Sequence, residues 1–238
     1  MDASYPVGRW LAAAARFALP PRCLVCGDEG EAFRELCRAC RLSLPRNLAC
    51  CGRCAVPLPI ALPECDACRK GPRPWADIWV PFEYGFPLDS LEARFKFAGS
   101  LAAGRVLSGC WVDAGPPPSM PELILPVPLH VSRLRSRGYN QALELARPLA
   151  RRFGVPMAHD VLVRARRTGA QSELSAEARA GNVRAAFAVE RVPRESHVAI
   201  VDDVMTTGAT VGECAKALLA AGVRRVDVWA LARTPLGR

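Results

Sequence analysis

Two neighbouring acidic residues followed by a run of small hydroxyl residues form the part of the chain best suited to chemistry. Asp202 and Asp203 follow four apolar residues, 198–201, which indicate a buried strand of a parallel sheet. Soon after them comes a short turn made of Thr206, Thr207, Gly208, Ala209 and Thr210. The turn opens a segment, residues 209–221, whose apolar residues have helical spacing and which is followed by Gly222.

This order of strand, acidic pair, turn and helix predicts a site for a sugar phosphate. Backbone amides at the start of a helix can hold a phosphate dianion, and Gly208 lets the backbone approach it closely. The carboxylates of Asp202 and Asp203 can accept hydrogen bonds from sugar hydroxyls or bind Mg²⁺ beside them. The competing interpretation is that the acids merely end a strand and the threonines only cap a helix. Average residue usage makes the whole string a rare coincidence, so we favour the sugar-phosphate site.

Eight cysteines form four CxxC pairs that begin every 14 residues. The pairs are Cys23 with Cys26, Cys37 with Cys40, Cys51 with Cys54, and Cys65 with Cys68. A CxxC turn presents two thiolates to one ion, so eight ligands make two tetrahedral zinc sites, which we expect to be structural. We expect this small segment to need its metal to fold. The pairs can be grouped sequentially or interleaved, and we favour the sequential grouping.

Three cysteines stand outside this pattern. Cys50 adjoins Cys51 and could replace it as a ligand, although it breaks the period. Cys110 and Cys214 lie in apolar helical stretches, and we expect both in the core. Gly27 and Gly52 stand beside their pairs and suit the tight turns that such sites require.

The chain contains no apolar run that approaches the roughly 18 residues of a membrane helix. Residues 10–19 are apolar enough for a short signal-peptide core, but Arg16 interrupts them and no convincing cleavage site follows. We therefore expect a cytoplasmic chain without a membrane span. In that compartment thiols stay reduced, so paired cysteines favour metal sites over disulfides.

Arginine supplies almost all of the basic charge. The net charge is +9, and 29 of the 32 basic residues are arginine. Between Arg133 and Arg184, eleven arginines stand against four acidic residues. This balance favours phosphate partners, either a small substrate or a nucleic acid. An arginine-biased genome would give a similar count, so composition alone does not decide between them.

A basic segment follows the apolar strand predicted over residues 123–128, and we expect it to be a loop. Its candidate pyrophosphate-binding residues are His130, Arg133, Arg137 and Gly138. Open α/β sheets bind ligands in loops at the carboxyl ends of parallel strands, and guanidinium groups bind phosphate oxygens in pairs. The alternative is a solvated charged turn.

The rest of the pattern predicts an α/β fold, with a parallel sheet flanked by helices. Helices are predicted over 88–97, 101–112 and 142–153, and strands over 78–84, 161–164, 185–189 and 225–232. Pro81 suggests that the first of these strands lies at a sheet edge. Lys96 lies on the first helix, where we expect a surface lysine rather than a ligand contact. A long polar segment is typical of a lid or of disorder, and its candidate residues are Arg166, Arg167, Thr168, Gln171 and Arg179.

Taken together, the motifs carry a specific resemblance. Pro-Val-Pro-Leu-His begins at Pro126 and leads to Arg-Gly-Tyr-Asn-Gln at 137–141; residues 201–210 read Val-Asp-Asp-Val-Met-Thr-Thr-Gly-Ala-Thr. Between them lie Arg164, Thr168, Gln171 and Leu174. With the four CxxC pairs, the chain resembles the ComF family of competence protein F-like proteins over most of its length. The resemblance implies an N-terminal helix over 1–21, a double zinc ribbon over 22–72 and a type I phosphoribosyltransferase-like domain over 75–238.

The resemblance also implies roles for the candidate residues. Asp202 and Asp203 would bind the ribose hydroxyls of phosphoribosyl pyrophosphate (PRPP), with Mg²⁺ bridging to them or nearby. The turn at 206–210 would cradle the 5′-phosphate, the segment 130–138 would hold pyrophosphate, and 166–179 would be the flexible lid. Closure of such a lid keeps water away from a cationic sugar centre.

The sequence leaves the function open between an enzyme and a binding protein. An enzyme would displace pyrophosphate from PRPP, but its acceptor is undefined because no base-recognising hood is evident. The printed chain begins with Met1 rather than a cysteine nucleophile, so we do not expect glutamine-dependent amide transfer. The alternative is a non-catalytic accessory factor in natural transformation that binds nucleotide or single-stranded DNA, with DNA-uptake proteins as partners. A PRPP-sensing regulator is a third option on fold analogy alone.

Overall fold

The computed structural model describes residues 21–31, 34–164 and 186–235. The chain divides into two compact units, with the boundary between Leu44 and Pro45. The helix expected over 1–21 falls almost wholly outside the described residues. The candidate lid residues also lie outside them: Arg166, Arg167, Thr168, Gln171 and Arg179. Within the described ranges, no helix is long and apolar enough to cross a membrane.

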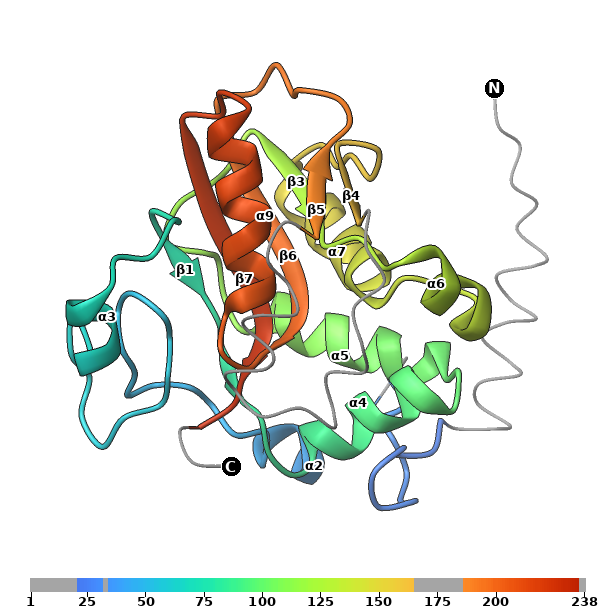
Figure 1. The fold of residues 1–238 in the computed structure, drawn as a ribbon. Helices are drawn as coiled ribbons and strands as arrows, with labels where there is room; N and C mark the ends of the chain where they lie inside the picture. The colour runs from blue at the N-terminus through green and yellow to red at the C-terminus, as the bar shows by residue number, and fades with distance from the viewer. Residues whose placement is uncertain (1–20, 32–33, 165–185, 236–238) are drawn as a thin grey trace. The chain divides into compact units, whose positions relative to one another are not determined.

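A parallel sheet forms the centre of the second unit (Figure 1). Its strands are β1 (Ile78–Trp79), β2 (Phe82–Glu83), β3 (Leu123–Pro126), β6 (His197–Met205) and β7 (Arg225–Arg233). The order is β1-β7-β6-β3, with β2 also paired to β7, and every pairing is parallel. The predicted strand over 78–84 is interrupted at Pro81, and both halves lie at the sheet edge beside β7, which confirms the edge position.

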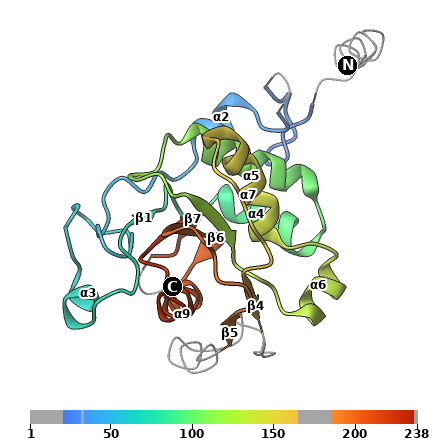
Figure 2. The same cartoon turned by 90° about the horizontal axis from the view of Figure 1, so that it is seen from above.

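Helices cover both faces of this sheet (Figure 2). Helices α5 (Leu101–Asp113) and α7 (Gln141–Phe153) lie on one face, and α9 (Ala209–Ala220) lies on the other. Four aromatic rings fill the first face, with neighbouring centroids 5.4–6.0 Å apart: Trp79, Trp111, Phe153 and Trp229. Cys110 of α5 and Cys214 of α9 are both buried, which confirms that both are core residues.

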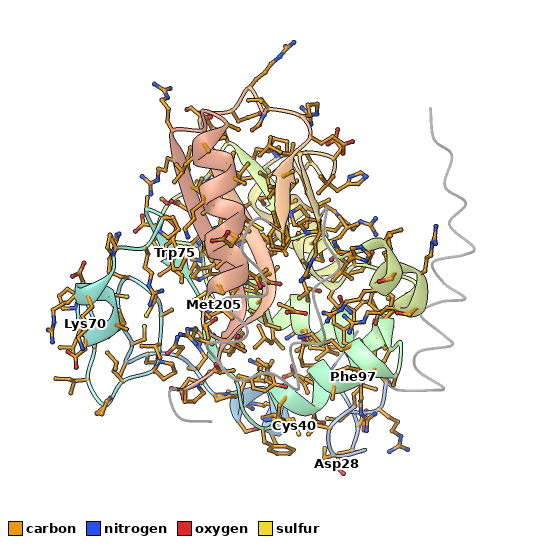
Figure 3. All side chains as sticks on the ribbon, in the orientation of Figure 1. Asp28, Cys40, Lys70, Trp75, Phe97 and Met205 are labelled. Carbon is orange, nitrogen blue, oxygen red and sulfur yellow. The ribbon has the colours of Figure 1, made fainter. Side chains whose placement is uncertain are left out.

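Two further elements flank this core. Helix α4 (Leu88–Phe97) packs against α5 and ends at Phe97, which is labelled in Figure 3. Strands β4 (Leu162–Arg164) and β5 (Phe187–Val189) pair with each other in antiparallel register and form a separate two-stranded sheet. The helices predicted over 88–97, 101–112, 142–153 and 209–221 begin and end within one residue of their predicted bounds.

Strand β6 is longer than the predicted 198–201 and contains the acidic pair. Strand β3 pairs with it only as far as Pro126 opposite Val201. Beyond that point β7 continues the pairing, with Asp202 opposite Ala230. The last part of β6 therefore has a strand partner on one side only among the described strands. The acidic pair lies where the sheet opens at its carboxyl edge.

The basic segment after β3 is a short helix, so the prediction of a loop there is wrong. Helix α6 spans Val131–Arg137. The backbone N–H of Ser132 donates to Nδ1 of His130 at 3.2 Å, which caps the first turn. Gly138 ends the helix with φ +83°, a conformation that residues with a Cβ rarely adopt. His130 and Gly138 therefore have structural roles as helix caps.

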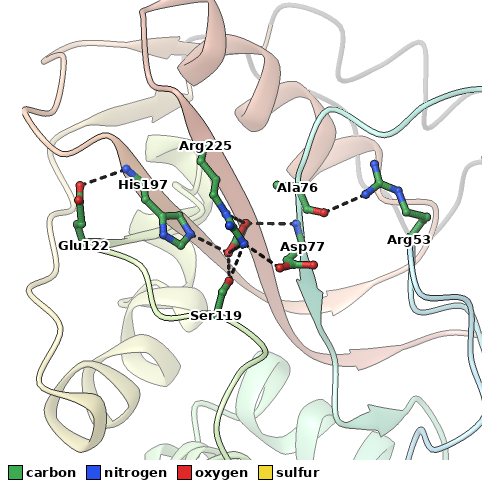
Figure 4. A network of polar contacts seen from close by, with 8 residues as sticks. Arg53, Ala76, Asp77, Ser119, Glu122, His197 and Arg225 are labelled. Carbon is green, nitrogen blue, oxygen red and sulfur yellow. Dashed lines mark hydrogen bonds and ion pairs between the residues drawn. The ribbon is translucent and has the colours of Figure 1, made fainter. Parts of the chain in front are cut away.

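A network of charged groups closes the opposite, amino-terminal edge of the sheet (Figure 4). Asp227 is buried and accepts hydrogen bonds from Ser119 at 2.5 Å, from Arg225 at 3.1 and 3.3 Å, and pairs with Nε2 of His197 at 2.7 Å. Arg225 also donates to Asp77 at 2.7 Å. Burial alone would raise the pKa of Asp227, but these hydrogen bonds outweigh it and hold the pKa below its usual value.

We expect Asp227→Asn to lower the free energy of unfolding by about 2 kcal/mol at pH 7, because it removes charge-assisted hydrogen bonds from a buried group. The folded pKa lies below the unfolded value of about 4, so this contribution is complete above pH 4 and is lost as the pH falls through the folded pKa. Urea denaturation at pH 7 and pH 3.5 should therefore show a smaller gap between variant and wild type at the lower pH.

Asp77→Asn is the matched control. Asp77 is half exposed and pairs with the same arginine, so its loss should change stability by less than about 1 kcal/mol. Equal effects of the two variants would contradict the assignment of Asp227 as the centre of the network.

Candidate functional site

The eight paired cysteines form two separate clusters, each made of consecutive pairs. One contains Cys23, Cys26, Cys37 and Cys40, and the other contains Cys51, Cys54, Cys65 and Cys68. Within each cluster the four sulfur atoms lie within 4.8 Å of one another. This is the sequential grouping, which we favoured although the spacing allows both. Cys50 belongs to neither cluster among the described residues.

The sulfur positions fit a tetrahedral zinc ion. Zinc–sulfur bonds of about 2.3 Å place neighbouring sulfurs about 3.8 Å apart. The Sγ atoms of Cys54 and Cys65 are 3.7 Å apart, and those of Cys51 and Cys68 are 3.9 Å apart. The backbone N–H groups of Arg53 and Cys65 donate to Sγ of Cys51 at 3.4 and 3.2 Å, which favours a thiolate there. These are sites of the kind that a structural zinc occupies.

In each cluster, the residue after the first CxxC turn has a positive φ, but the residue type differs. In the first cluster, Gly27 follows the turn with φ +84°. The corresponding residue of the second cluster is Ala55, with φ +53°. Gly52 instead lies close to the backbone carbonyl of Pro63, where a Cβ would be 3.0 Å away. Gly52 is therefore needed for close approach rather than for the turn that we expected.

A cavity of about 540 Å³ lies at the carboxyl edge of the sheet. Asp202 and Asp203 line it, together with four residues of the adjoining turn: Thr206, Gly208, Ala209 and Thr210. Arg133 and Arg137 of α6 and Arg164 of β4 line it too. The structure thus brings together most residues that the sequence proposed. His130, Gly138 and Thr207 are not among the described residues that line the cavity.

Lys96 is a cavity residue, so the prediction of a surface lysine is wrong. Its side chain is only 21% exposed, and its Nζ lies 2.9 Å from Oδ2 of Asp203 and 2.7 Å from Oε1 of Glu92. Glu92 is buried one helical turn before it on α4. The ammonium group therefore bridges two carboxylates from different elements, and water screens the three charges poorly.

The carboxyl groups respond differently to this environment. Burial and the charge of Asp203 raise the pKa of Asp202 to about 8. Burial also acts to raise the pKa of Asp203, but the Lys96 ammonium outweighs it and lowers the pKa. Burial and repulsion from Asp203 raise the pKa of Glu92 to about 7. The site thus contains more carboxyl groups than its lysine keeps ionised. A cation or a hydroxyl donor beside Asp202 would favour the ionised form of that carboxyl group.

The turn between β6 and α9 is built for close approach of a ligand. Gly208 is the N-cap residue of α9, with φ +80°, and has no side chain of its own to cap the helix. The backbone N–H of Ala209 donates to the hydroxyl of Thr207 at 3.3 Å. The start of a helix also carries partial positive charge. Such a turn can accept an anion, as the sequence predicts.

The Arg-Gly-Tyr-Asn stretch positions α6 beside the cavity. The Tyr139 hydroxyl donates to the carbonyl of Phe95, and the two rings stack 5.3 Å apart. Asn140 donates to the carbonyl of Val127 at 3.0 Å and caps the start of α7. Arg137 lies over the ring of Phe97, 5.8 Å from its centroid. These contacts connect α4, α6 and α7 around the arginine side of the site.

Comparisons with known proteins agree with this organisation. A family model described as a phosphoribosyl transferase domain matches residues 140–238, and one described as a double zinc ribbon domain matches residues 14–70. The chain is 34% identical over 222 residues to competence protein F of Haemophilus influenzae, which covers 89% of this chain and 96% of that protein. The chain belongs to the ComF family.

The DNA utilization protein YhgH of Salmonella typhimurium and that of Escherichia coli K12 are each 33% identical to this ComF-family chain. Each match spans 205 residues and covers 84% of this chain and 90% of the relative. The expected family and the α/β fold with a Cys-rich N-terminal region are therefore confirmed.

We expect elemental analysis of the purified protein to give close to two zinc ions per chain, one for each cysteine cluster. Cys26→Ser and Cys68→Ser should each reduce this ratio to one, because each removes a ligand from a different cluster. Cys110→Ser is the control, since Cys110 belongs to neither cluster. One zinc or none in the wild type would contradict the two-site assignment.

We expect Lys96→Met to lower the free energy of unfolding by about 3 kcal/mol, because it leaves Glu92 and Asp203 as unpaired buried carboxyl groups. Lys216→Met removes an ammonium that is 65% exposed and pairs with Glu213 at 2.8 Å, so its effect should stay below about 0.5 kcal/mol. Urea denaturation of both variants measures the difference. Similar losses in the two would show that Lys96 behaves as a surface residue.

Proposed function

We propose that this chain binds PRPP or a closely related ribose phosphate in the cavity at the carboxyl edge of the sheet, and that it acts in the handling of DNA taken up by the cell. One observation carries the proposal. The acidic pair, residues of the turn before α9 and three arginines line the same cavity. Ribose hydroxyls, a 5′-phosphate and a pyrophosphate need these three kinds of group.

Each group has a distinct task in this proposal. Asp202 and Asp203 accept hydrogen bonds from the ribose hydroxyls, and the turn at 206–210 holds the 5′-phosphate. Arg133 and Arg137 hold pyrophosphate, while His130 and Gly138 keep α6 in position. Mg²⁺ fits the oxygen donors of the acidic pair, and when bound it would neutralise charge on the pyrophosphate. The segment 166–179 remains our candidate for the lid.

If the chain is an enzyme, its residues serve the departure of pyrophosphate from the sugar. Positive charge then develops on the sugar, and the carboxylates of Asp202 and Asp203 stabilise it, while the arginines receive the leaving group. No single acid or base is required of the protein in this reaction. The names of the relatives, competence protein F and DNA utilization protein, support a role in DNA uptake or use.

We expect PRPP with Mg²⁺ to raise the melting temperature of the full chain by about 5–10 °C when the ligand is present at roughly 100 times its Kd. The double substitution Asp202→Asn with Asp203→Asn should abolish this shift. Glu92 still pairs with Lys96 in that variant, so the fold should survive. Asp160→Asn, which removes an exposed carboxylate, is the matched control and should retain the shift. An unchanged shift in the double variant would refute the site.

The second candidate is a non-catalytic protein that binds single-stranded DNA. The arginines and the cysteine clusters would then contact the DNA backbone, and the relatives' names favour this option. Release of pyrophosphate from PRPP, measured across a panel of nitrogen nucleophiles, separates the two candidates. Turnover with any acceptor supports the enzyme, whereas salt-dependent DNA binding without turnover supports the accessory factor.

A further inference from the structure

Arg233, the last residue of β7, is a cation buried between the second cysteine cluster and the turn at 206–210. It is only 4% exposed. Its Nε donates to the backbone carbonyl of Cys54 at 3.1 Å. Its Nη1 donates to the carbonyls of Met205, at 3.1 Å, and of Thr206. One rigid guanidinium group thus joins a cluster ligand to the residues that open the turn.

The bonding pattern makes Arg233 a strong constraint. A buried cation is stable only when hydrogen bonds compensate it, and here backbone carbonyls accept from Nε and Nη1. Carbonyls of three separate segments must therefore keep their places around one planar group. A shift of the Cys54 carbonyl would change the position available to the carbonyl of Thr206.

Trp75 makes a second connection between the same two regions. Its indole Nε1 donates to the carbonyl of Arg53, inside the Cys51–Cys54 turn, at 2.8 Å. The edge of its ring lies under Gly208, where an added Cβ would be 3.2 Å from the ring and 3.6 Å from the sulfur of Met205. Figure 3 labels both Trp75 and Met205 beside α9. The ring therefore fixes how closely the turn can approach the cluster.

Arg73 links the cluster and this ring. Its Nε donates to Sγ of Cys68 at 3.3 Å, and its guanidinium lies over the Trp75 ring, 5.8 Å from the centroid. A thiolate held by a metal is a better acceptor for this bond than a free thiol. Arg73 thus connects a cysteine of the cluster to Trp75.

We propose that the second cysteine cluster, through Arg233 and Trp75, sets the conformation of the turn at 206–210 and thereby the affinity for a 5′-phosphate. The inference rests on the proposed ribose-phosphate site and adds that its phosphate end depends on this cluster. Arg233 and Trp75 are positioning residues that act through the backbone of the turn. Pyrophosphate, which would bind the arginines of α6, should be little affected.

Calorimetric titration of the full chain with ribose 5-phosphate, and separately with inorganic pyrophosphate, tests whether only the affinity for the 5′-phosphate depends on these residues. Arg233→Met should lower the affinity for ribose 5-phosphate about tenfold and leave the affinity for pyrophosphate within about twofold of the wild type. Trp75→Phe, which keeps a ring but loses the indole N–H, should weaken ribose 5-phosphate about threefold. Arg191→Met removes an exposed arginine that pairs with Asp160, and it should change the affinity for neither ligand. Equal losses for both ligands would overturn the inference, because they would indicate general destabilisation.

The metal side of the inference is tested by two variants that each lose one zinc. Cys68→Ser should lower the affinity for ribose 5-phosphate about tenfold, whereas Cys26→Ser in the other compact unit should leave this affinity unchanged. Hydrogen exchange of the amides at 205–212, measured without ligand, should be faster in Cys68→Ser and Arg233→Met than in Cys26→Ser. Equal exchange in all three would overturn the linkage. Failure of the wild type to bind either ligand would instead refute the proposed function, and the exchange result would still decide the linkage.

Discussion

Burial of two adjacent carboxyl groups at the open end of β6 is the constraint around which the candidate site is arranged. Burial, and after it the charge of Asp203, raises the pKa of Asp202 to about 8, so the two groups are not both ionised at neutral pH. The ammonium group of Lys96 forms ion pairs with both Asp203 and Glu92. Hydroxyl donors or a cation beside Asp202 would favour its ionised form. A ligand that supplies such a group would therefore stabilise the site.

Short-range patterns in the sequence were sufficient for the parts of the molecule that local physics determines. The acidic pair, the turn around Gly208 and the helix after it are contiguous, so their arrangement follows from the order of residues. The cysteine clusters follow from a constant spacing, since each CxxC turn faces one ion. The predicted helices were also correct to within a residue because apolar periodicity and end signals agree.

The errors concern contacts between distant segments or competing local signals. Lys96 meets Asp203 only because α4 lies beside the end of β6, and no pattern near Lys96 reveals this. Arg233 and Trp75 likewise acquire their partners through the fold. Helix α6 was missed because arginine density suggested a loop, although His130 and Gly138 supplied both caps. A search for caps would have found that helix, whereas the Lys96 pairing requires knowledge of the packing.

The charge distribution of the cavity bears on which phosphate ligand it prefers. A nucleic acid backbone would satisfy the arginines, but it would bring further negative charge close to the acidic pair, and deoxyribose within a strand offers no free hydroxyl to it. A ribose phosphate with two free hydroxyls satisfies both halves, because its hydroxyls donate to the carboxylates and its phosphates face the arginines and the start of α9. DNA therefore fits an arginine-rich surface away from the acidic pair better than it fits the cavity. The two candidate functions thus require different parts of the molecule, and both could operate in one chain.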